Sequence, residues 1–338
     1  FHVVSRGHMS ERPQVCERSM PEQNYLAIPP LLILNDDGRD FEVFMKLRKD
    51  YILYAKGDVL TKKHREILYN NEVKSLYIKA EEKDSYEKHI DKNFARILHD
   101  KEIPLEERTK VFYEHGSNVA QSIYGKNFPV IVDKAALKKL KQFVEISFVF
   151  FAQNKNAFRS LRSIISHNYK TYTHCIHVMA YTYFILNEMH LDEKLLVKIG
   201  LGAMLHDIGK TAIPNAILDK PARLTPEEFE LVKTHPVKGM SICQLINLPH
   251  ISANCVLFHH EKLDGSGYPA MTRDIPDYVR AMTLADIYDA LVSERPYNKA
   301  FSPFEALKIM RKDVERGKLD QDIYKIFVGL LSQSQIIA

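Results

Sequence analysis

Histidine and aspartate residues recur at wide intervals in the C-terminal half of the chain. The pair His206-Asp207 is followed by Ile208-Gly209-Lys210, then by His235 and by His259-His260-Glu261. Imidazole nitrogens and carboxylate oxygens are the usual protein ligands of hydrolytic transition-metal ions. The lysine just after the first pair brings a positive charge to the same place. This combination favours an anionic substrate, and a phosphate ester is the obvious candidate.

These residues must be carried by helices that direct them toward one point. The segment Asp192 to Leu205 is apolar on most of its surface, which is typical of a buried helix. His206 and Asp207 fall at its C-terminal end, where we expect Gly209 to terminate it. A polar pair in this position must find polar partners inside the protein. Taken alone, the pair favours a hydrogen-bonded core contact over a metal site.

Other predicted helices carry further candidates. His174 lies on an apolar stripe of the predicted helix Thr171 to His190, where a satisfied core histidine is the alternative to a ligand. His177, one turn away, competes with it for the role. His259 and His260 are adjacent, so on a regular helix their side chains would point about 100° apart. Both can serve one cluster only if they meet two metals or if the helix ends there.

One acid on a later predicted helix, Asp286 or Asp289, could face the same cluster. The loop Asp264 to Pro269 (DGSGYP) is rich in turn-forming residues, and we expect Asp264 to serve the turn. Next to the paired histidines, this loop would form a rim over the metals.

The pattern of the chain predicts an α+β protein, with a small N-terminal α/β domain over residues 25–80. Alternating and apolar runs indicate its strands, and a helical pattern covers Leu60 to Asn70. The predicted strands are Phe41 to Leu47, Tyr51 to Ala55 and Val73 to Ile78. Helical patterns then predict a connector over 81–130 and an all-α bundle over 131–338. We interpret residues 1–24 as a tag remnant and a loose N-terminus.

The length, charge and composition limit the classes of function that the chain can have. The 338 residues are enough for two domains, and the net charge of +4 gives no support for a nucleic acid polymer as partner. Four cysteines without CxxC spacing indicate free thiols in a reducing compartment. No apolar run is long enough to cross a bilayer, and we see no signal peptide. We therefore expect a cytoplasmic protein that does not bind a membrane.

Taken in order, the motifs closely resemble the HD-GYP family, a branch of the HD phosphohydrolases, over about residues 130 to 330. The match rests on Met204 to Lys210, Ile213-Pro214, Leu218, Lys220-Pro221, Leu224 to Glu228, His235-Pro236, Gly239, His259 to Glu261, Asp264 to Pro269, Ala285-Asp286, Asp289 to Leu291 and Arg295 to Tyr297. Residues 25–80 are similar, more weakly, to a small domain that often precedes bacterial HD-GYP domains. The resemblance implies an all-helical phosphodiesterase that hydrolyses cyclic di-GMP to pGpG, GMP or both.

The resemblance also implies roles for single residues. One metal would be held by His174, His206, Asp207 and Asp286, and a second by Asp207, His235, His259 and His260. The two divalent ions would be iron or manganese, and the ligand types fit either. A hydroxide bridging the ions would attack phosphorus, with Asp207 and Lys210 as the catalytic residues. Lys210, Arg295 and Tyr268 would contact the substrate.

Two positions depart from the family pattern. Where some members have a glutamate that binds a third metal, this chain has Lys170, so we expect two ions. A basic residue that often follows the Arg-Pro-Tyr motif is Asn298 here, with Lys299 beside it, which predicts a weaker or altered grip on substrate. Two alternatives therefore stay open: a weakly active or inactive signalling adaptor whose DGSGYP loop binds partner proteins, and a phosphohydrolase for another nucleotide. A homodimer is also left open.

Overall fold

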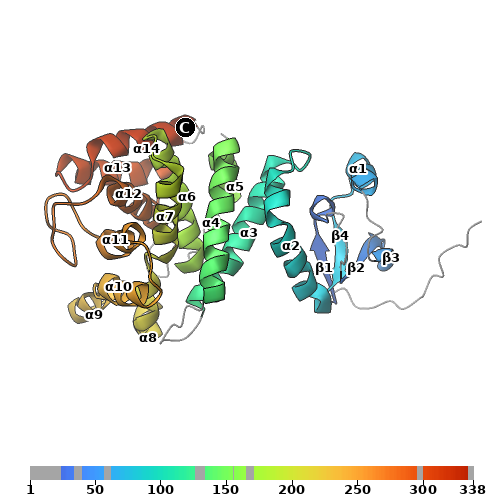
Figure 1. Ribbon diagram of the computed structural model, residues 1–338, viewed down its shortest axis with the longest axis horizontal. Coiled ribbons are helices and arrows are strands. Elements are labelled where there is room, and N and C mark those ends of the chain that lie inside the picture. Colours follow the sequence, from blue (N-terminus) through green and yellow to red (C-terminus); the bar gives the residue numbers. More distant parts are fainter. Residues whose placement is uncertain are drawn as a thin grey trace, which may run out of the picture. The chain divides into compact units, whose positions relative to one another are not determined.

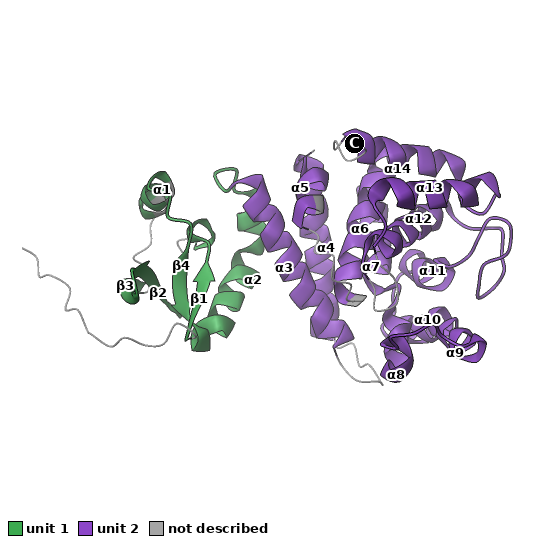
Figure 2. Ribbon diagram, turned by 180° about the vertical axis from the view of Figure 1, so that it is seen from behind, with its two compact units in different colours: residues 1–103 green, residues 104–338 purple. Residues whose placement is uncertain are grey.

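The computed structural model describes residues 24–33, 40–56, 62–125, 134–154, 156–164, 171–294 and 300–333. The chain divides into two compact units, residues 1–103 and 104–338 (Figures 1 and 2). The first contains a small sheet and the second is helical, so the predicted α+β class is confirmed. The finer division into accessory domain, connector and bundle stays a prediction, and residues 1–23 lie outside the described residues.

The sheet of the first unit has four antiparallel strands in the order β1-β4-β2-β3. The strands are β1 Tyr25–Ile28, β2 Glu42–Leu47, β3 Asp50–Lys56 and β4 Leu76–Lys79. Strands β2 to β4 and helix α1 (Lys62–Asn70) match the predicted segments. Strand β1 is not among the predicted strands, because four residues before two prolines are too few to show an alternating pattern.

One hydrophobic cluster holds this unit together. The buried faces of the strands meet residues from α1 and from the segment before β2, including Ile33 and Leu68. Each fully buried aliphatic or aromatic side chain of this kind stabilises the fold by about 1.5–3 kcal/mol. A short 3-10 helix, Ala80–Glu82, leads from β4 into α2 (Lys83–His99), which belongs to the same unit.

The second unit is built from helices (Figure 2). They are α3 Leu105–Tyr124, α4 Lys134–Gln153, α5 Ala157–Ile164, α6 Thr171–Glu188, α7 Glu193–Leu205, α8 Asn215–Leu218, α9 Pro226–Val232, α10 His235–Leu245, α11 His250–Phe258, α12 Asp277–Val292, α13 Pro303–Glu315 and α14 Gln321–Gln333, with a 3-10 helix η5 at Ile208–Ala212. Helix α6 lies at the centre and packs against α3, α7 and α12.

Helix α7 is fixed tightly between its neighbours, and this sets the position of the residues that follow it. Its N-terminus is capped by Asp192, whose side chain accepts a hydrogen bond from Lys194 N at 2.9 Å. A Cβ atom on Gly202 would lie 2.5 Å from Cys255 Cβ of α11, and one on Gly200 would lie 2.7 Å from a methyl group of Val144 on α4. Any larger side chain at either position would push α7 away from these helices.

The cysteines and the helices of the described ranges agree with two predictions from the sequence. Cys175, Cys243 and Cys255 are buried free thiols, as predicted, while Cys16 lies outside the described residues. None of the helices in the described ranges combines the length and the apolar character needed to span a membrane.

Candidate metal centre

The His206-Asp207 pair lies where α7 gives way to η5. Helix α7 ends at Leu205, and both His206 and Asp207 are almost wholly buried. The expectation that Gly209 terminates α7 is wrong, because the chain turns into a 3-10 helix at Asp207 and Gly209 lies inside it. Gly209 instead permits contact with α10: a Cβ there would collide with the His235 carbonyl and lie 2.6 Å from Gly239 N.

This close contact between η5 and α10 brings the second histidine to the first pair. His235 is the first residue of α10 and is fully buried. Its Nε2 atom lies 3.4 Å from Asp207 Oδ1. Without a glycine at position 209, the backbone of α10 could not approach Asp207 this closely.

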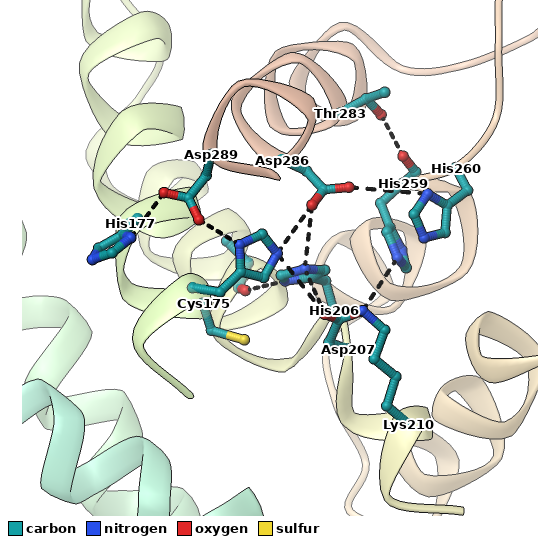
Figure 3. A network of polar contacts seen from close by, with 12 residues as sticks. Cys175, His177, His206, Asp207, Lys210, His259, His260, Thr283, Asp286 and Asp289 are labelled. Atoms are coloured by element: carbon teal, nitrogen blue, oxygen red, sulfur yellow. Dashed lines mark hydrogen bonds and ion pairs between the residues drawn. The ribbon is translucent and has the colours of Figure 1, made fainter. Parts of the chain in front are cut away.

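His259 and His260 reach the cluster because α11 ends at Phe258. His259 Nε2 lies 3.1 Å from His235 Nε2 and 3.9 Å from Asp207 Oδ1. The rings of His259 and His260 are 4.1 Å apart between centroids. The end of the helix is therefore the condition that allows two adjacent histidines to face one site (Figure 3).

Helices α6 and α12 supply the other side of the site. His174 Nε2 lies 3.0 Å from Asp286 Oδ1 and 3.9 Å from Asp207 Oδ2. Asp289 lies one turn further along α12 and accepts hydrogen bonds from Nδ1 of both His174 (2.7 Å) and His177 (2.8 Å). Of the two pairs that the residue pattern alone left open, His174 and Asp286 face the cluster, whereas His177 and Asp289 lie behind it. Figure 3 shows Asp286 among the histidines of the cluster and Asp289 beside His177.

The same local contact orients three of the imidazoles. Nδ1 of His206, His235 and His259 lies 2.7, 2.8 and 2.9 Å from the backbone carbonyl three residues earlier in the chain. A carbonyl oxygen only accepts, so each Nδ1 must carry the proton. In His174 the Asp289 carboxylate has the same effect. In the neutral imidazole, the Nε2 atom of each ring is then an unprotonated donor of electrons, the form that binds a metal ion.

Electron-rich nitrogen and oxygen atoms that share no proton therefore lie in contact with one another. The Nε2 atoms of His235 and His259 are the clearest example. Across the described part of the chain, His206 Nε2 and Asp207 Oδ1 are buried without a hydrogen-bond partner. Buried polar atoms normally have partners. The donor set fits divalent cations of the borderline type.

The ligand atoms form two groups that share one carboxylate. In the first, atoms of Asp207, His235, His259 and His260 all lie within 4.8 Å of one another; in the second, those of His174, His206 and Asp207 do. Asp286 lies beside the second group, with Oδ1 4.0 Å from His206 Nε2 and Oδ2 3.9 Å from His260 Nδ1. Two buried clusters joined by Asp207 are consistent with a binuclear metal site.

The electrostatics hold Asp207 and His235 in the state that binds metal, whereas His206 must release a proton first. Burial lowers the pKa of His206, but the charge of Asp207 outweighs it and raises that pKa to about 9. Burial raises the pKa of Asp207, but Lys210, whose Nζ is 2.6 Å from Oδ2, and the surrounding histidines outweigh it and leave the pKa well below its ordinary value. Burial lowers the pKa of His235 to about 4. At neutral pH the cluster therefore offers an ionised carboxylate and a neutral imidazole, which need no deprotonation before they bind an ion.

The DGSGYP loop forms the rim that the sequence predicts. Tyr268 packs on the His260 ring at 4.6 Å between centroids, and its backbone N–H donates to the His260 carbonyl at 3.3 Å. Glu261 is buried and accepts hydrogen bonds from the N–H groups of Ala270 and Met271 at 2.6 and 3.1 Å. Asp264 is half-buried and accepts hydrogen bonds from the N–H and the hydroxyl of Ser266 within the turn, as expected.

A family model described as "HD domain" matches residues 152–323, just over half of the chain. The chain belongs to the HD-domain family. The residues of both clusters fall inside the matched segment.

Several relatives with named activities are similar to parts of this chain. The chain is 36% identical to cyclic di-GMP phosphodiesterase PA4108 of Pseudomonas aeruginosa, over 52% of this chain and 43% of the relative. It is 33% identical to a cyclic di-GMP phosphodiesterase of Thermotoga maritima, over 65% and 61%. A third relative, 3′3′-cGAMP-specific phosphodiesterase 1 of Vibrio cholerae, is 31% identical over 47% and 37%. The chain thus spans between 37% and 61% of the length of these relatives.

The fold has a solved counterpart. Bd1817 of Bdellovibrio bacteriovorus, described as an HDG"Y"P protein, superposes with a TM-score of 0.65, covering 91% of this chain and all of that one. At 21% identity the likeness concerns the fold alone. The family model and the relatives confirm the resemblance stated from the sequence, and the fold of Bd1817 agrees with it.

Some residues of this HD domain were not found from the sequence, and others cannot be placed. The bridging role of Asp289 and the loop contacts of Glu261 were missed, although both residues stand within matched motifs. The signal for Asp289 was its position one turn from Asp286, opposite two histidines one turn apart. Lys170, Arg295, Asn298 and Lys299 lie outside the described residues, so the expectations attached to them stay predictions.

Proposed function

We propose that this protein is a metal-dependent phosphodiesterase that hydrolyses cyclic di-GMP. The observation that carries the proposal is the pair of buried clusters with Asp207 in common, whose imidazoles present unprotonated Nε2 atoms. The relatives named as cyclic di-GMP phosphodiesterases support the substrate.

The residues proposed to hold two divalent ions are those that the family pattern assigns. They are His174, His206, Asp207 and Asp286 for one ion, and Asp207, His235, His259 and His260 for the other. When bound, two such ions supply the activation of water and the electrophilic stabilisation of phosphoryl oxygens. Iron and manganese both suit the nitrogen and carboxylate donors, and we propose them as the ions used.

The side chains of the protein do the remaining work. Lys210 holds its ammonium 2.6 Å from Asp207 Oδ2, and 19% of its side chain is exposed, so it can also meet a phosphoryl oxygen that arrives at the cluster. Charge held in place before the reaction stabilises the transition state without reorganisation. Tyr268 covers the His260 ring and limits access of water from that side. Asp207 and Lys210 are thus the proposed catalytic residues, with Lys210, Tyr268 and Arg295 as substrate contacts.

A second candidate has a specific observation behind it. One relative is named as specific for 3′3′-cGAMP, so a mixed cyclic dinucleotide is the alternative substrate. Both candidates need the same metal centre and differ only in one purine base.

The test uses the full chain purified without oxygen and loaded with iron or manganese. Cyclic di-GMP, 3′3′-cGAMP and bis(p-nitrophenyl) phosphate are supplied in parallel, and products are separated by chromatography. We expect linear pGpG or GMP from the first substrate, at a higher kcat/KM than from the second. The His206→Ala variant is the blank. Cleavage of the nitrophenyl ester alone, with both cyclic dinucleotides intact, would refute the proposed substrate class while leaving the metal centre in place.

A further inference from the structure

A cation and two aromatic rings lie at the rim of the metal cluster. Phe229 is on α9, and Lys233 follows at its C-terminal end. Lys233 Nζ lies 5.6 Å from the centroid of the Phe229 ring and 5.9 Å from that of Tyr268. Because the Tyr268 ring packs against His260, these contacts connect α9, through Tyr268, to one of the proposed metal ligands.

Phe229 is open to a ligand. It exposes 48% of its surface, although burying such a ring would stabilise the protein by about 1.5–3 kcal/mol. Exposure alone carries no meaning, since Phe304 on α13 is 61% exposed as well. The difference lies in the surroundings: Phe229 shares a cation with an aromatic residue of the rim. Exposed aromatic faces beside a positive charge are what proteins use to stack nucleobases.

A ligand can replace the ionic partner of the Lys233 ammonium group. Its Nζ pairs with Glu230 Oε1 at 2.6 Å, and the Glu230 side chain is 68% exposed. A pair of this kind contributes little to stability, so a ligand atom can replace the carboxylate at small cost. Lys233 itself is 28% exposed, with its amine held between the two rings.

We propose that Phe229, Lys233 and Tyr268 form a base-binding subsite of the metal centre that selects guanine. A purine base of the substrate stacks on the aromatic rings, and the Lys233 ammonium donates to the acceptors O6 and N7 of guanine. Adenine presents an amino donor where guanine has O6, so the same ammonium disfavours it. The inference rests on the proposed function, because it places the base of a cyclic dinucleotide whose phosphate is at the metals.

The first test separates stacking from catalysis. In Phe229→Ala we expect the KM for cyclic di-GMP to rise about 5- to 150-fold, the range for loss of one base-stacking contact, with kcat nearly unchanged. Phe304→Ala is the matched control, because it removes another exposed ring, on α13, and we expect its KM to equal that of the wild type. Melting temperature and metal content are measured for both variants.

The second test addresses the choice of base. The ratio of kcat/KM for cyclic di-GMP over cyclic di-AMP should fall about 5- to 150-fold in Lys233→Met, since one lysine–guanine contact is lost. Lys233→Arg should keep the ratio, because a guanidinium also donates to both acceptors. Unchanged ratios in Lys233→Met would overturn the assignment of Lys233.

A binding experiment keeps this inference distinct from the proposed function. Calorimetric titration of the metal-loaded protein with GMP and with AMP should show tighter binding of GMP, weakened in Phe229→Ala and equalised with AMP in Lys233→Met. If the wild type cleaves no cyclic dinucleotide and still shows this pattern, the subsite stands and the proposed reaction falls. If GMP and AMP bind alike to the wild type, the subsite falls, whatever the enzyme cleaves.

Discussion

Replacing Asp289 with asparagine tests whether a residue behind the cluster controls metal binding. The two carboxylate oxygens accept hydrogen bonds from Nδ1 of His174 at 2.7 Å and of His177 at 2.8 Å. Asparagine has nearly the same shape but only one acceptor oxygen, so its amide group must face one of the two Nδ1–H groups. If that ring is His174, its proton moves to Nε2, which points at Asp286 Oδ1 3.0 Å away and is the proposed metal-binding atom.

The size of the effect follows from this loss of orientation. Removing a carboxylate that orients a ligating histidine typically lowers metal affinity by about 10- to 100-fold. At 25 °C this corresponds to about 1.4–2.7 kcal/mol of binding free energy. We expect the loss at one ion only, because His235 and His259 take their orientation from backbone carbonyls and not from Asp289.

The assay is a titration of metal-free protein with Mn²⁺ under anaerobic conditions, in competition with a chromogenic chelator, with total metal measured by mass spectrometry. The control is Ser252→Ala, which removes a buried hydroxyl that donates to the Lys198 carbonyl of α7 and touches no proposed ligand. Circular dichroism establishes that both variants are folded. An Asp289→Asn protein that binds two ions with the affinity of the wild type would show that the orientation of His174 does not depend on this carboxylate.

Three further predictions concern single parts of the site. Lys210→Ala should retain both ions but lose about 10²- to 10³-fold in kcat, the usual cost of removing one charge-stabilising donor; full activity would exclude a role for the amine at the phosphate. Gly209→Ala should lower the melting temperature and the metal content together, because its Cβ collides with the His235 carbonyl; a wild-type melting curve would contradict the close contact of η5 and α10. The free energy of unfolding of the metal-free protein should fall as the pH falls from about 6.5 to about 4. Burial lowers the pKa of His235 in the folded protein to about 4, so the unfolded chain binds a proton at higher pH than the folded one. Thermal melts in the presence of a chelator that show no such loss would refute this.

The sequence led to the family and to the set of candidate ligands because metal ligation restricts residue type at each position. The residue pattern alone did not decide between His174 and His177, or between Asp286 and Asp289, and only the resemblance to the family assigned His174 and Asp286. Each pair is separated by one helical turn, so both members lie on the same face, and only the depth at which α12 packs on α6 distinguishes them. The structure uses all four, with two facing the cluster and two supporting it.

Other errors have similar causes. Gly209 was expected to end a helix because glycine often does so, whereas its actual contact is with a residue distant in sequence, the carbonyl of His235. Strand β1 was missed because it gains its partners from β4, about fifty residues later in the chain, rather than from a pattern of its own. Local rules predict local structure, and each of these features depends on tertiary contact.

The contact of three imidazoles with carbonyls in their own turn has a consequence for how the protein is loaded. Each ring is locked by backbone within three residues, so the folded chain has already lost the side-chain entropy that ligation would otherwise cost. An ion that enters from solution therefore meets ligands that are already oriented. Under the proposed function, exchange of one divalent ion for another would then require no refolding, so the supply of metal, more than the shape of the site, would decide which ion is bound.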